Sequence, residues 1–166
     1  MDARRHSEIA SMKNVTTVKR KSDREVVVTR LFEAPALLVF EAWSTPELFM
    51  RWWVPKSTGM TLRSCEMDVR TGGTYRLGFG DDMDFFGRYL EVTSPSLIVW
   101  TNDEGGENGS VTTVTLTEAD GKTLLVMSEL YPSKEALDAE GGGAADATHE
   151  TFGQLDELIV ELTSKS

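Results

Sequence analysis

Residues 30–55, RLFEAPALLVFEAWSTPELFMRWWVP, constrain the fold more than any other part of the chain. Pro35 and Pro46 fit the first turns of two short helices, where a missing N–H costs nothing, and Thr45 is a suitable N-cap for the second helix. The stretch also holds three of the four tryptophans. Two helices this short cannot bury so many large rings against each other. We therefore expect the pair to close one end of a curved sheet around an apolar interior.

The chain after these helices alternates between apolar and polar side chains, as strands do. With the run before the helices, strands are expected at residues 24–32, 60–69, 74–79, 85–93, 97–101, 111–118 and 123–131. Gly72 and Gly73 supply a tight turn, and Asp120 with Gly121 is a strong signal for a two-residue hairpin. The hairpin register predicts two pairs on the interior face, Leu116 with Leu125 and Val114 with Met127.

One long helix, about 30 Å in length, is expected over residues 144–164. Its predicted buried stripe consists of Thr148, Phe152, Leu155, Ile159 and Leu162, with Leu158 beside it. The order of elements predicts an α+β fold. In it, the long helix packs across a strongly curved antiparallel sheet of about six or seven strands.

The length of 166 residues suits one domain with a core of its own. We expect a flexible basic segment at residues 1–22 and the folded domain at residues 23–166. The first segment carries six Lys and Arg against two acidic side chains, although the whole chain has a net charge of −10. We interpret this segment as a loosely ordered terminus rather than a nucleic-acid arm, because the acidic body repels nucleic acid and anionic membranes. Met12 is a second plausible start, which would make residues 1–11 incidental.

The composition also bears on compartment and metals. No apolar run is long enough to span a bilayer and the charged start lacks the apolar core of a signal peptide, so we expect a cytoplasmic protein. A single cysteine, Cys65, excludes an internal disulfide and a cysteine metal cluster. Only two histidines, His6 and His149, are present. We expect no metal and no cofactor, and we interpret the acidic residues as a solvated turn because they lack calcium-loop spacing: Asp81, Asp82 and Asp84.

Several short motifs occur in one order along the chain: Ala34 with Pro35, Val39 with Phe40, Ala42 with Trp43, Trp52 and Trp53 before Pro55, Asp68 and Arg70 before Gly72 and Gly73, Phe86 with Gly87 before Tyr89, and Tyr131 to Glu135 as YPSKE. With these motifs the chain resembles the START-like (SRPBCC) superfamily. Within it, the chain is similar to the branch named for homology to the activator of the 90-kDa heat-shock protein ATPase, whose bacterial members are often labelled polyketide cyclase-like. The resemblance begins near Arg24 and continues to the end of the chain.

This resemblance implies a helix-grip fold, with a hydrophobic cavity between the sheet and the long C-terminal helix. Members of the superfamily bind lipids, hormones or polyketides, catalyse cyclisation or hydrolysis, or assist a chaperone. The chain departs from the branch before the long helix. Where Arg-Asp and Gly-Met steps are common, it has Leu137 with Asp138 and Gly143 with Ala144. We therefore expect the mouth of the cavity to differ.

Aromatic side chains are the candidate walls of this cavity, because small-molecule sites are mostly apolar. The full aromatic set is Trp43, Trp52, Trp53, Phe79, Phe85, Phe86, Trp100 and Phe152. The residues that we predict to bind a ligand are Trp43, Trp53, Phe79, Phe86, Trp100, Met127 and Phe152. The alternative for each of them is that it simply fills the core.

Glu129 and His149 are the candidate general bases. The hairpin register points Glu129 inward near Tyr131, either at the rim of the sheet or inside the cavity. Histidine is a common general base, but His149 lies roughly 60° from the buried stripe, so a partly exposed surface histidine is the alternative. We interpret Asp68 and Arg70 as a structural pair at the hairpin.

Three functions follow as hypotheses. The first is binding of a small hydrophobic or amphipathic molecule between the sheet and the long helix. The second is an enzyme of the cyclase or hydrolase type in the same cavity, with Glu129 or His149 as the base. The third is an interaction module for a chaperone partner, with Thr113, Thr115 and Thr117 on the exposed sheet face. The same face and a free edge strand also allow a homodimer.

Overall fold

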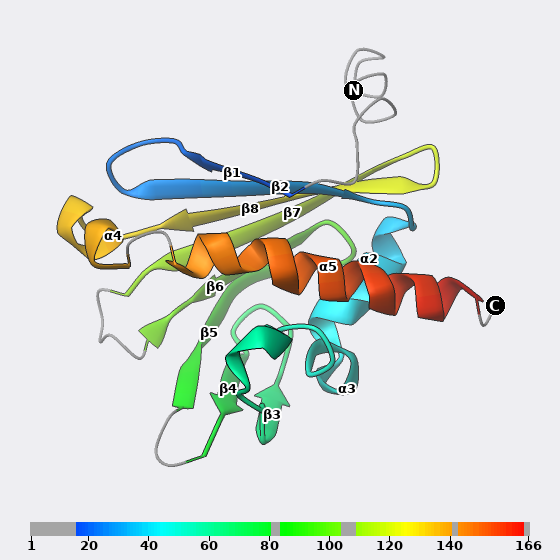
Figure 1. The fold of residues 1–166 in the computed structure, drawn as a ribbon, viewed down its shortest axis with the longest axis horizontal. Helices are drawn as coiled ribbons and strands as arrows, with labels where there is room; N and C mark the ends of the chain where they lie inside the picture. The colour runs from blue at the N-terminus through cyan, green and yellow to red at the C-terminus, as the bar shows by residue number, and fades with distance from the viewer. Residues whose placement is uncertain (1–15, 81–83, 104–108, 141–142, 165–166) are drawn as a thin grey trace.

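The structure is a computed structural model that describes residues 16–80, 84–103, 109–140 and 143–164. Its centre is an eight-stranded antiparallel sheet in the order β1-β2-β8-β7-β6-β5-β4-β3, which twists strongly from one edge to the other (Figure 1). The strands are β1 (Thr17–Arg20), β2 (Glu25–Phe32), β3 (Ser64–Met67), β4 (Thr74–Gly78), β5 (Asp84–Thr93), β6 (Leu97–Thr101), β7 (Val111–Ala119) and β8 (Lys122–Leu130). The helices are α2 (Ala36–Ser44), α3 (Pro46–Phe49), the 3₁₀ helix η1 (Lys56–Thr58), α4 (Lys134–Glu140) and α5 (Gly143–Ser164).

The predicted α+β class with a long C-terminal helix is confirmed, with one strand more than expected. The extra strand is β1, which pairs with β2 from Thr17 opposite Thr29 to Arg20 opposite Val26. It lies inside the segment predicted to be flexible, of which Thr17–Arg20 belongs to the sheet. The strand expected at residues 60–69 is shorter, because only Ser64–Met67 pairs with β4.

The hairpin of β7 and β8 has the predicted register. Leu116 lies opposite Leu125, and Val114 lies opposite Met127. Asp120 and Gly121 form the turn with φ values of 55° and 76°. Positive φ at both central residues is the type I′ geometry, whose twist matches that of the flanking strands.

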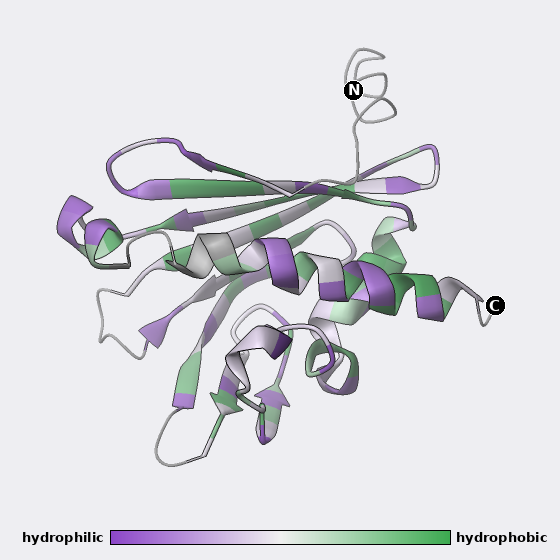
Figure 2. Ribbon diagram, in the orientation of Figure 1, coloured by the Kyte–Doolittle hydropathy of each residue, from purple (hydrophilic) through white to green (hydrophobic). Residues whose placement is uncertain are grey.

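Helix α5 crosses the concave face of the sheet, and hydrophilic residues occupy much of the side that faces the viewer (Figures 1 and 2). The predicted stripe is confirmed: Thr148, Phe152, Leu155, Leu158 and Ile159 are buried, and Leu162 is half-buried. Thr151 and Gln154 are buried as well. No helix among the described residues is both long and apolar enough to cross a membrane.

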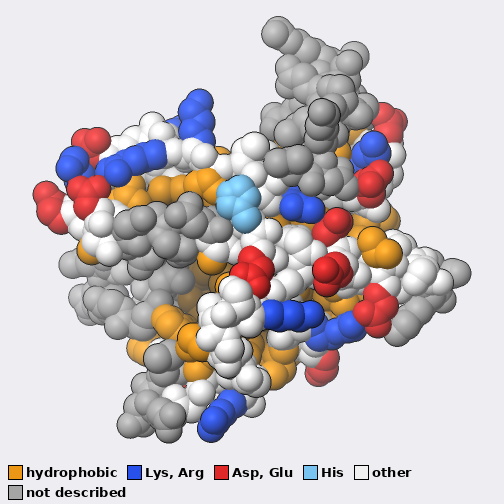
Figure 3. All heavy atoms as spheres, in the orientation of Figure 1, with side chains coloured by type: hydrophobic (Ala, Val, Ile, Leu, Met, Phe, Trp, Pro, Cys, Tyr) orange, Lys and Arg blue, Asp and Glu red, His pale blue; other side chains and the backbone are white. Residues whose placement is uncertain are grey.

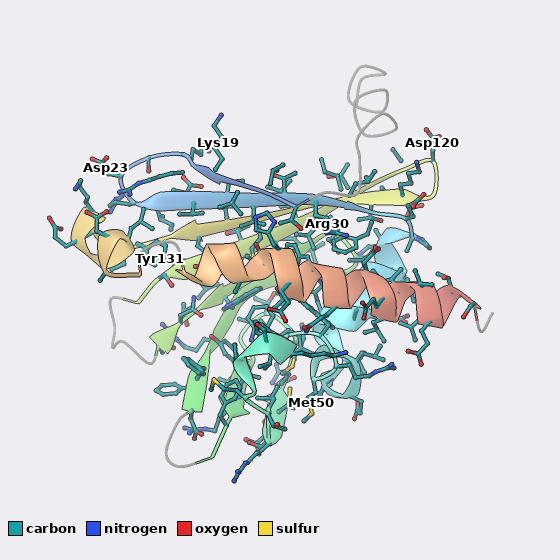
Figure 4. The ribbon with its side chains drawn as sticks, viewed as in Figure 1. Lys19, Asp23, Arg30, Met50, Asp120 and Tyr131 are labelled. Carbon is teal, nitrogen blue, oxygen red and sulfur yellow. The ribbon has the colours of Figure 1, made fainter. Side chains whose placement is uncertain are left out.

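Arg30 joins β2 to α5 and lies between these two elements in Figure 4. Its side chain donates hydrogen bonds to Thr16 Oγ1 at 3.0 Å and to Asp156 Oδ2 at 3.4 Å, and its guanidinium lies 5.4 Å from the centre of the Phe32 ring. The charge is mostly buried, so this pairing matters for the packing of α5 against β2. Tyr131 lies near α4 in Figure 4, and Asp120 lies at the tip of the β7–β8 hairpin.

Candidate functional site

A cavity of about 200 Å³ lies between the two short helices and the β3–β6 part of the sheet. We call it the ring-lined pocket. Its lining residues are Trp43, Phe49, Trp53, Met67, Tyr75, Leu77, Phe79, Phe85, Tyr89, Ile98, Trp100 and Asn102. Apolar side chains reach the surface below α5 in Figure 3, where Figure 1 places β3 to β5.

The two prolines begin the helices that carry one wall of the pocket. Pro35 is the N-cap of α2, and Pro46 is the first residue of α3, with Thr45 at the N-cap position without a side-chain capping bond. Helix α2 carries Trp43 and helix α3 carries Phe49, and both rings line the pocket. The opposite wall follows strand alternation, because side chains two residues apart share a face. It comprises Tyr75 and Leu77 on β4 and Ile98 and Trp100 on β6.

Gly87 leaves room for the Tyr75 ring, because it has no side chain. A Cβ at this position would lie 1.9 Å from the Thr101 carbonyl oxygen and 2.8 Å from a carbon of the Tyr75 ring. No other residue fits without moving backbone, so the glycine lets β5 pass close to both neighbours. The Tyr75 ring then lies against Tyr89, with the ring centres 5.7 Å apart.

Trp43 is the centre of the aromatic cluster beside the pocket. Five rings have centres 4.7 to 6.4 Å from its own, those of Phe49, Trp52, Trp53, Trp100 and Phe152. Most of these pairs are tilted or edge-to-face, the arrangement that aromatic quadrupoles favour.

The indole N–H of Trp43 is buried and has no hydrogen-bond partner among the described residues. The adjacent Trp52 shows the ordinary arrangement, since its indole N–H donates to the Ala42 carbonyl at 2.9 Å. A buried donor without a partner costs roughly 1–3 kcal/mol. Trp43, which lines the pocket with part of its ring, therefore carries an unsatisfied donor that is itself shielded from the cavity.

Two other polar side chains of the lining bond to their neighbours. The Tyr75 hydroxyl donates to the Thr101 carbonyl at 2.8 Å. Asn102 donates through Nδ2 to Ser110 and to Thr112 Oγ1. These bonds fix the two side chains within the wall.

Tyr89 also lines the pocket, and it is 5% exposed. Burial, and secondarily the nearby Cys65 and Asp68, raise the pKa of Tyr89 above its usual value. Burial, followed by Glu47, also raises the pKa of the Cys65 thiol to about 11. Both groups stay protonated at neutral pH, and the surroundings of the pocket disfavour negative charge.

Helix α5 controls the loop that carries Trp53. The buried Gln154 donates through Nε2 to the carbonyls of Trp52 and Val54, both at 2.9 Å, and accepts from the Lys56 N–H at 2.9 Å. One turn earlier, Glu150 accepts from the backbone N–H and the hydroxyl of Ser57, and these bonds lower the pKa of its carboxyl group.

The predicted ligand-binding residues separate into three groups. Trp43, Trp53, Phe79 and Trp100 line the ring-lined pocket. Met127 and Phe152 are in the core and do not line it, being 2% and 0% exposed. Phe86 lies on the other face of the sheet beneath the Arg76 guanidinium, in a groove with charged walls. The ring-lined pocket therefore lies under the short helices. No described residue of α5 lines it, whereas the expectation placed the cavity against this long helix.

The two candidate bases lie outside the lining. Glu129 is on the inner face as predicted, and accepts a hydrogen bond from the Tyr131 hydroxyl at 2.9 Å. In the strand registers Trp100 pairs with Thr112, and Thr112 with Glu129, so one strand separates Glu129 from the wall. His149 is exposed on α5. Asp68 and Arg70 form the predicted ion pair at 2.8 Å.

Sequence reasoning did not select Phe49, Met67, Tyr75, Leu77, Tyr89, Ile98 and Asn102 as pocket residues. Strand alternation carries the signal for most of them, since Tyr75 and Leu77 share one face of β4. Among the residues that the structure describes, no three His, Cys, Asp or Glu side chains gather to form a metal site.

The fold and the pocket together define the class as a START-like α+β protein with a curved sheet, a long C-terminal helix and a cavity inside. The chain belongs to the family described as "Activator of Hsp90 ATPase homolog 1-like protein", which matches residues 33–160. No match was found among curated protein sequences.

Three solved structures illustrate the likeness of fold. A Rhodobacter sphaeroides protein is 23% identical with a TM-score of 0.77, over 89% of this chain and 99% of its own. Protein Ms6760 from Mycobacterium smegmatis is 25% identical with a TM-score of 0.72, over 92% of this chain and 99% of its own. CalU16 from Micromonospora echinospora is 19% identical with a TM-score of 0.63, over 92% of this chain and 88% of its own.

Proposed function

We propose that the protein binds one small, mostly apolar molecule in the ring-lined pocket. The observation that carries the proposal is a partly open cavity of about 200 Å³ whose walls are almost entirely aromatic and aliphatic. A cavity of about 150 Å³ with similar walls holds benzene, whereas sites for drug-sized ligands measure about 300–1,000 Å³. The size therefore favours one aromatic ring with a short substituent over a sterol, a long lipid chain or a multi-ring polyketide.

Within this proposal, Trp43, Trp53, Phe79 and Trp100 are walls that contact the ligand. Phe152 supports Trp43 from behind, because the centres of their rings are 6.2 Å apart. Met127 and Phe86 have no place against the ligand, since neither lines the pocket.

A titration with ethylbenzene, followed by methyl NMR, tests the proposal. The methyl groups of Leu77 and Ile98 should shift, whereas those of Leu155 and Ile159, buried beneath α5, should stay in place. Leu77→Phe is the matched control, because the larger ring fills the cavity and should abolish the shifts at Ile98. Unchanged Leu77 and Ile98 signals at saturating ethylbenzene would show that the pocket does not bind such molecules.

An enzyme of the cyclase or hydrolase type is the second candidate, with Glu129 or His149 as its base. Binding is better supported, because the described lining contains no Asp, Glu, His, Lys or Arg. Glu129→Gln distinguishes the two. A binding protein keeps its affinity for the ligand, whereas a catalyst that uses this base loses roughly 10²-fold or more in rate.

The family match supports an interaction with a chaperone as a third function. Thr113, Thr115 and Thr117 lie on the outer face of β7, opposite to the face that carries Val114 and Leu116. A chaperone ATPase rate that rises on addition of the protein, and falls back with Thr115→Arg, would support this role. A homodimer would use the same face or the edge strand β3, and sedimentation of the unmodified protein and of Thr115→Arg would reveal whether this face is the interface.

A further inference from the structure

Aromatic rings make up most of the wall of the ring-lined pocket. Eight of its twelve lining residues are Phe, Tyr or Trp. An aromatic ring carries a quadrupole whose faces are negative, so an aromatic wall attracts positive charge in a way that an aliphatic wall of the same size does not. The composition of the wall therefore bears on the charge of the guest as well as on its size.

The chain's own cations do not occupy these rings. The Arg30 guanidinium lies 5.4 Å from the centre of the Phe32 ring, and the Arg76 guanidinium lies 5.2 Å from that of Phe86. Neither of these two phenyl rings lines the pocket, and the described lining contains no Lys, Arg or His. A positively charged guest would therefore meet no competing cation among the side chains of the wall.

The electrostatic surroundings of the pocket also favour positive charge. The chain has 27 acidic and 17 basic side chains. Glu47 is exposed on α3, two positions before Phe49, and forms no ion pair with another residue of the described ranges. Its carboxylate adds to burial in raising the pKa of Cys65 to about 11, and the Cys65 Sγ lies 3.2 Å from the Sδ of Met67, a lining residue. The field of Glu47 thus reaches the wall, where it attracts a cation and repels an anion.

The kind of cation follows from the polar groups that the wall lacks. A primary ammonium group has three N–H donors that lose their water on entry, and the wall as described has no carboxylate to replace that water. A quaternary ammonium group has no N–H, and its methyl groups pack against apolar surface. Aromatic side chains hold such groups without any hydrogen bond. A cavity of about 200 Å³ has room for one such group on a small apolar body.

We propose that the ring-lined pocket selects a small molecule with a quaternary ammonium group over the neutral and the anionic molecule of the same shape, and that faces of the lining rings contact the ammonium methyl groups. The proposal rests on the proposed binding function and adds the chemical class of the ligand.

Three probes of nearly equal shape test the selection: the cation phenyltrimethylammonium, the neutral tert-butylbenzene and the anion benzenesulfonate. Each is titrated into the unmodified protein, and the methyl signals of Leu77 and Ile98 report binding in the pocket. The cation should bind roughly three- to thirtyfold more tightly than tert-butylbenzene, the range of one cation–π contact, and benzenesulfonate should bind most weakly. The N-methyl proton signal of the cation should move upfield on binding, because protons above a ring face are shielded.

Phe85→Leu removes one ring from the wall but keeps an apolar side chain, and Phe85 is exposed enough for the fold to tolerate the change. The preference for the cation should fall about two- to fivefold, while tert-butylbenzene still binds. Phe86→Leu is the matched control, because Phe86 is similarly exposed and does not line the pocket. It should leave both affinities unchanged.

Equal affinity for the cation and for tert-butylbenzene in the unmodified protein overturns the selection and leaves the pocket as a site for apolar molecules. Benzenesulfonate as the tightest probe overturns it too, and an N-methyl signal that does not move upfield overturns the contact with ring faces. If all three probes and ethylbenzene leave the Leu77 and Ile98 signals in place, the binding function is removed together with the selection.

Discussion

The interior of the protein has a filled half and a hollow half on one sheet. In the half covered by α5, Phe152 and Leu155 are fully buried, and this helix packs against β2 and α2. An ion pair between Arg30 and Asp156 joins β2 to α5. Under α2 and α3, the β3–β6 half surrounds the ring-lined pocket. The two halves differ in the helices that pack on the sheet. A helix of 22 residues supplies a long buried stripe that includes Phe152, Leu155 and Ile159, whereas helices of nine and four residues supply mainly large rings.

This contrast teaches that the covering element, and not the sheet, decides where space remains in such a fold. Aliphatic side chains interdigitate to the density of an organic crystal. Four experiments test the contrast, from the largest expected effect to the smallest.

Phe152→Ala should lower the free energy of unfolding by about 3–5 kcal/mol, because the ring is completely enclosed in the filled half. Chemical denaturation measures the loss. Val160→Ala on the same helix is the control, since Val160 is 61% exposed and its truncation should stay within about 0.5 kcal/mol. A loss under about 1 kcal/mol for Phe152→Ala would mean that α5 does not pack as described.

Gln154→Met should cost about 1–3 kcal/mol. It keeps the length of the side chain but removes the bonds to Trp52, Val54 and Lys56. Because these bonds fix the loop that carries Trp53, the affinity for ethylbenzene should fall as well. Glu157→Met, at an exposed position of α5, should change neither quantity. Unaltered affinity in the Gln154 variant would show that the two halves are independent.

Leu155→Phe and Leu77→Phe place the same extra volume in the two halves. The filled half should respond with a loss of about 1–3 kcal/mol from overpacking, whereas the hollow half should tolerate the ring at a cost of less than about 1 kcal/mol. Thermal and urea unfolding of both variants measure the difference. Equal costs for the two changes would remove the distinction between the halves.

Glu150→Gln should produce the smallest effect, and one that depends on pH. Hydrogen bonds from Ser57 hold the pKa of Glu150 below its ordinary value of 4.5 in the folded protein. The charged carboxylate therefore stabilises the fold above that value, and the contribution disappears as the pH falls through the lower folded pKa. The stability difference between the unmodified protein and the variant should shrink on acidification. Glu157→Gln, at an exposed position of the same helix, is the matched control.

The sequence predicted the parts of the fold that depend on local chemistry. Asp120 and Gly121 specify one turn geometry, and with period-two alternation this fixed the whole β7–β8 register. The stripe of α5 followed from helical spacing in the same way. Strand β1 was missed, because its sequence TVKR has little apolar character and its place in the sheet depends on pairing with β2.

The pocket was predictable only in part. Alternation shows which residues share a face, but Phe85 and Phe86 are neighbours, and only the register with β4 decides that Phe85 points inward. Met127 and Phe152 do face the interior, yet nothing in their spacing says that they lie under the filled half. The unpaired Trp43 N–H depends on the positions of five rings from four other segments and leaves no trace in the sequence.

The crowding of rings around Trp43 gives the protein an optical reporter of its own. All four tryptophans of the chain belong to one cluster, with Trp43 between 4.7 and 5.8 Å from Trp52, Trp53 and Trp100. Indoles this close exchange excitation energy, so a quencher or a polar guest beside one of them alters the emission of the whole set. Intrinsic fluorescence therefore reports the state of this single corner of the molecule, and no label has to be attached to follow it.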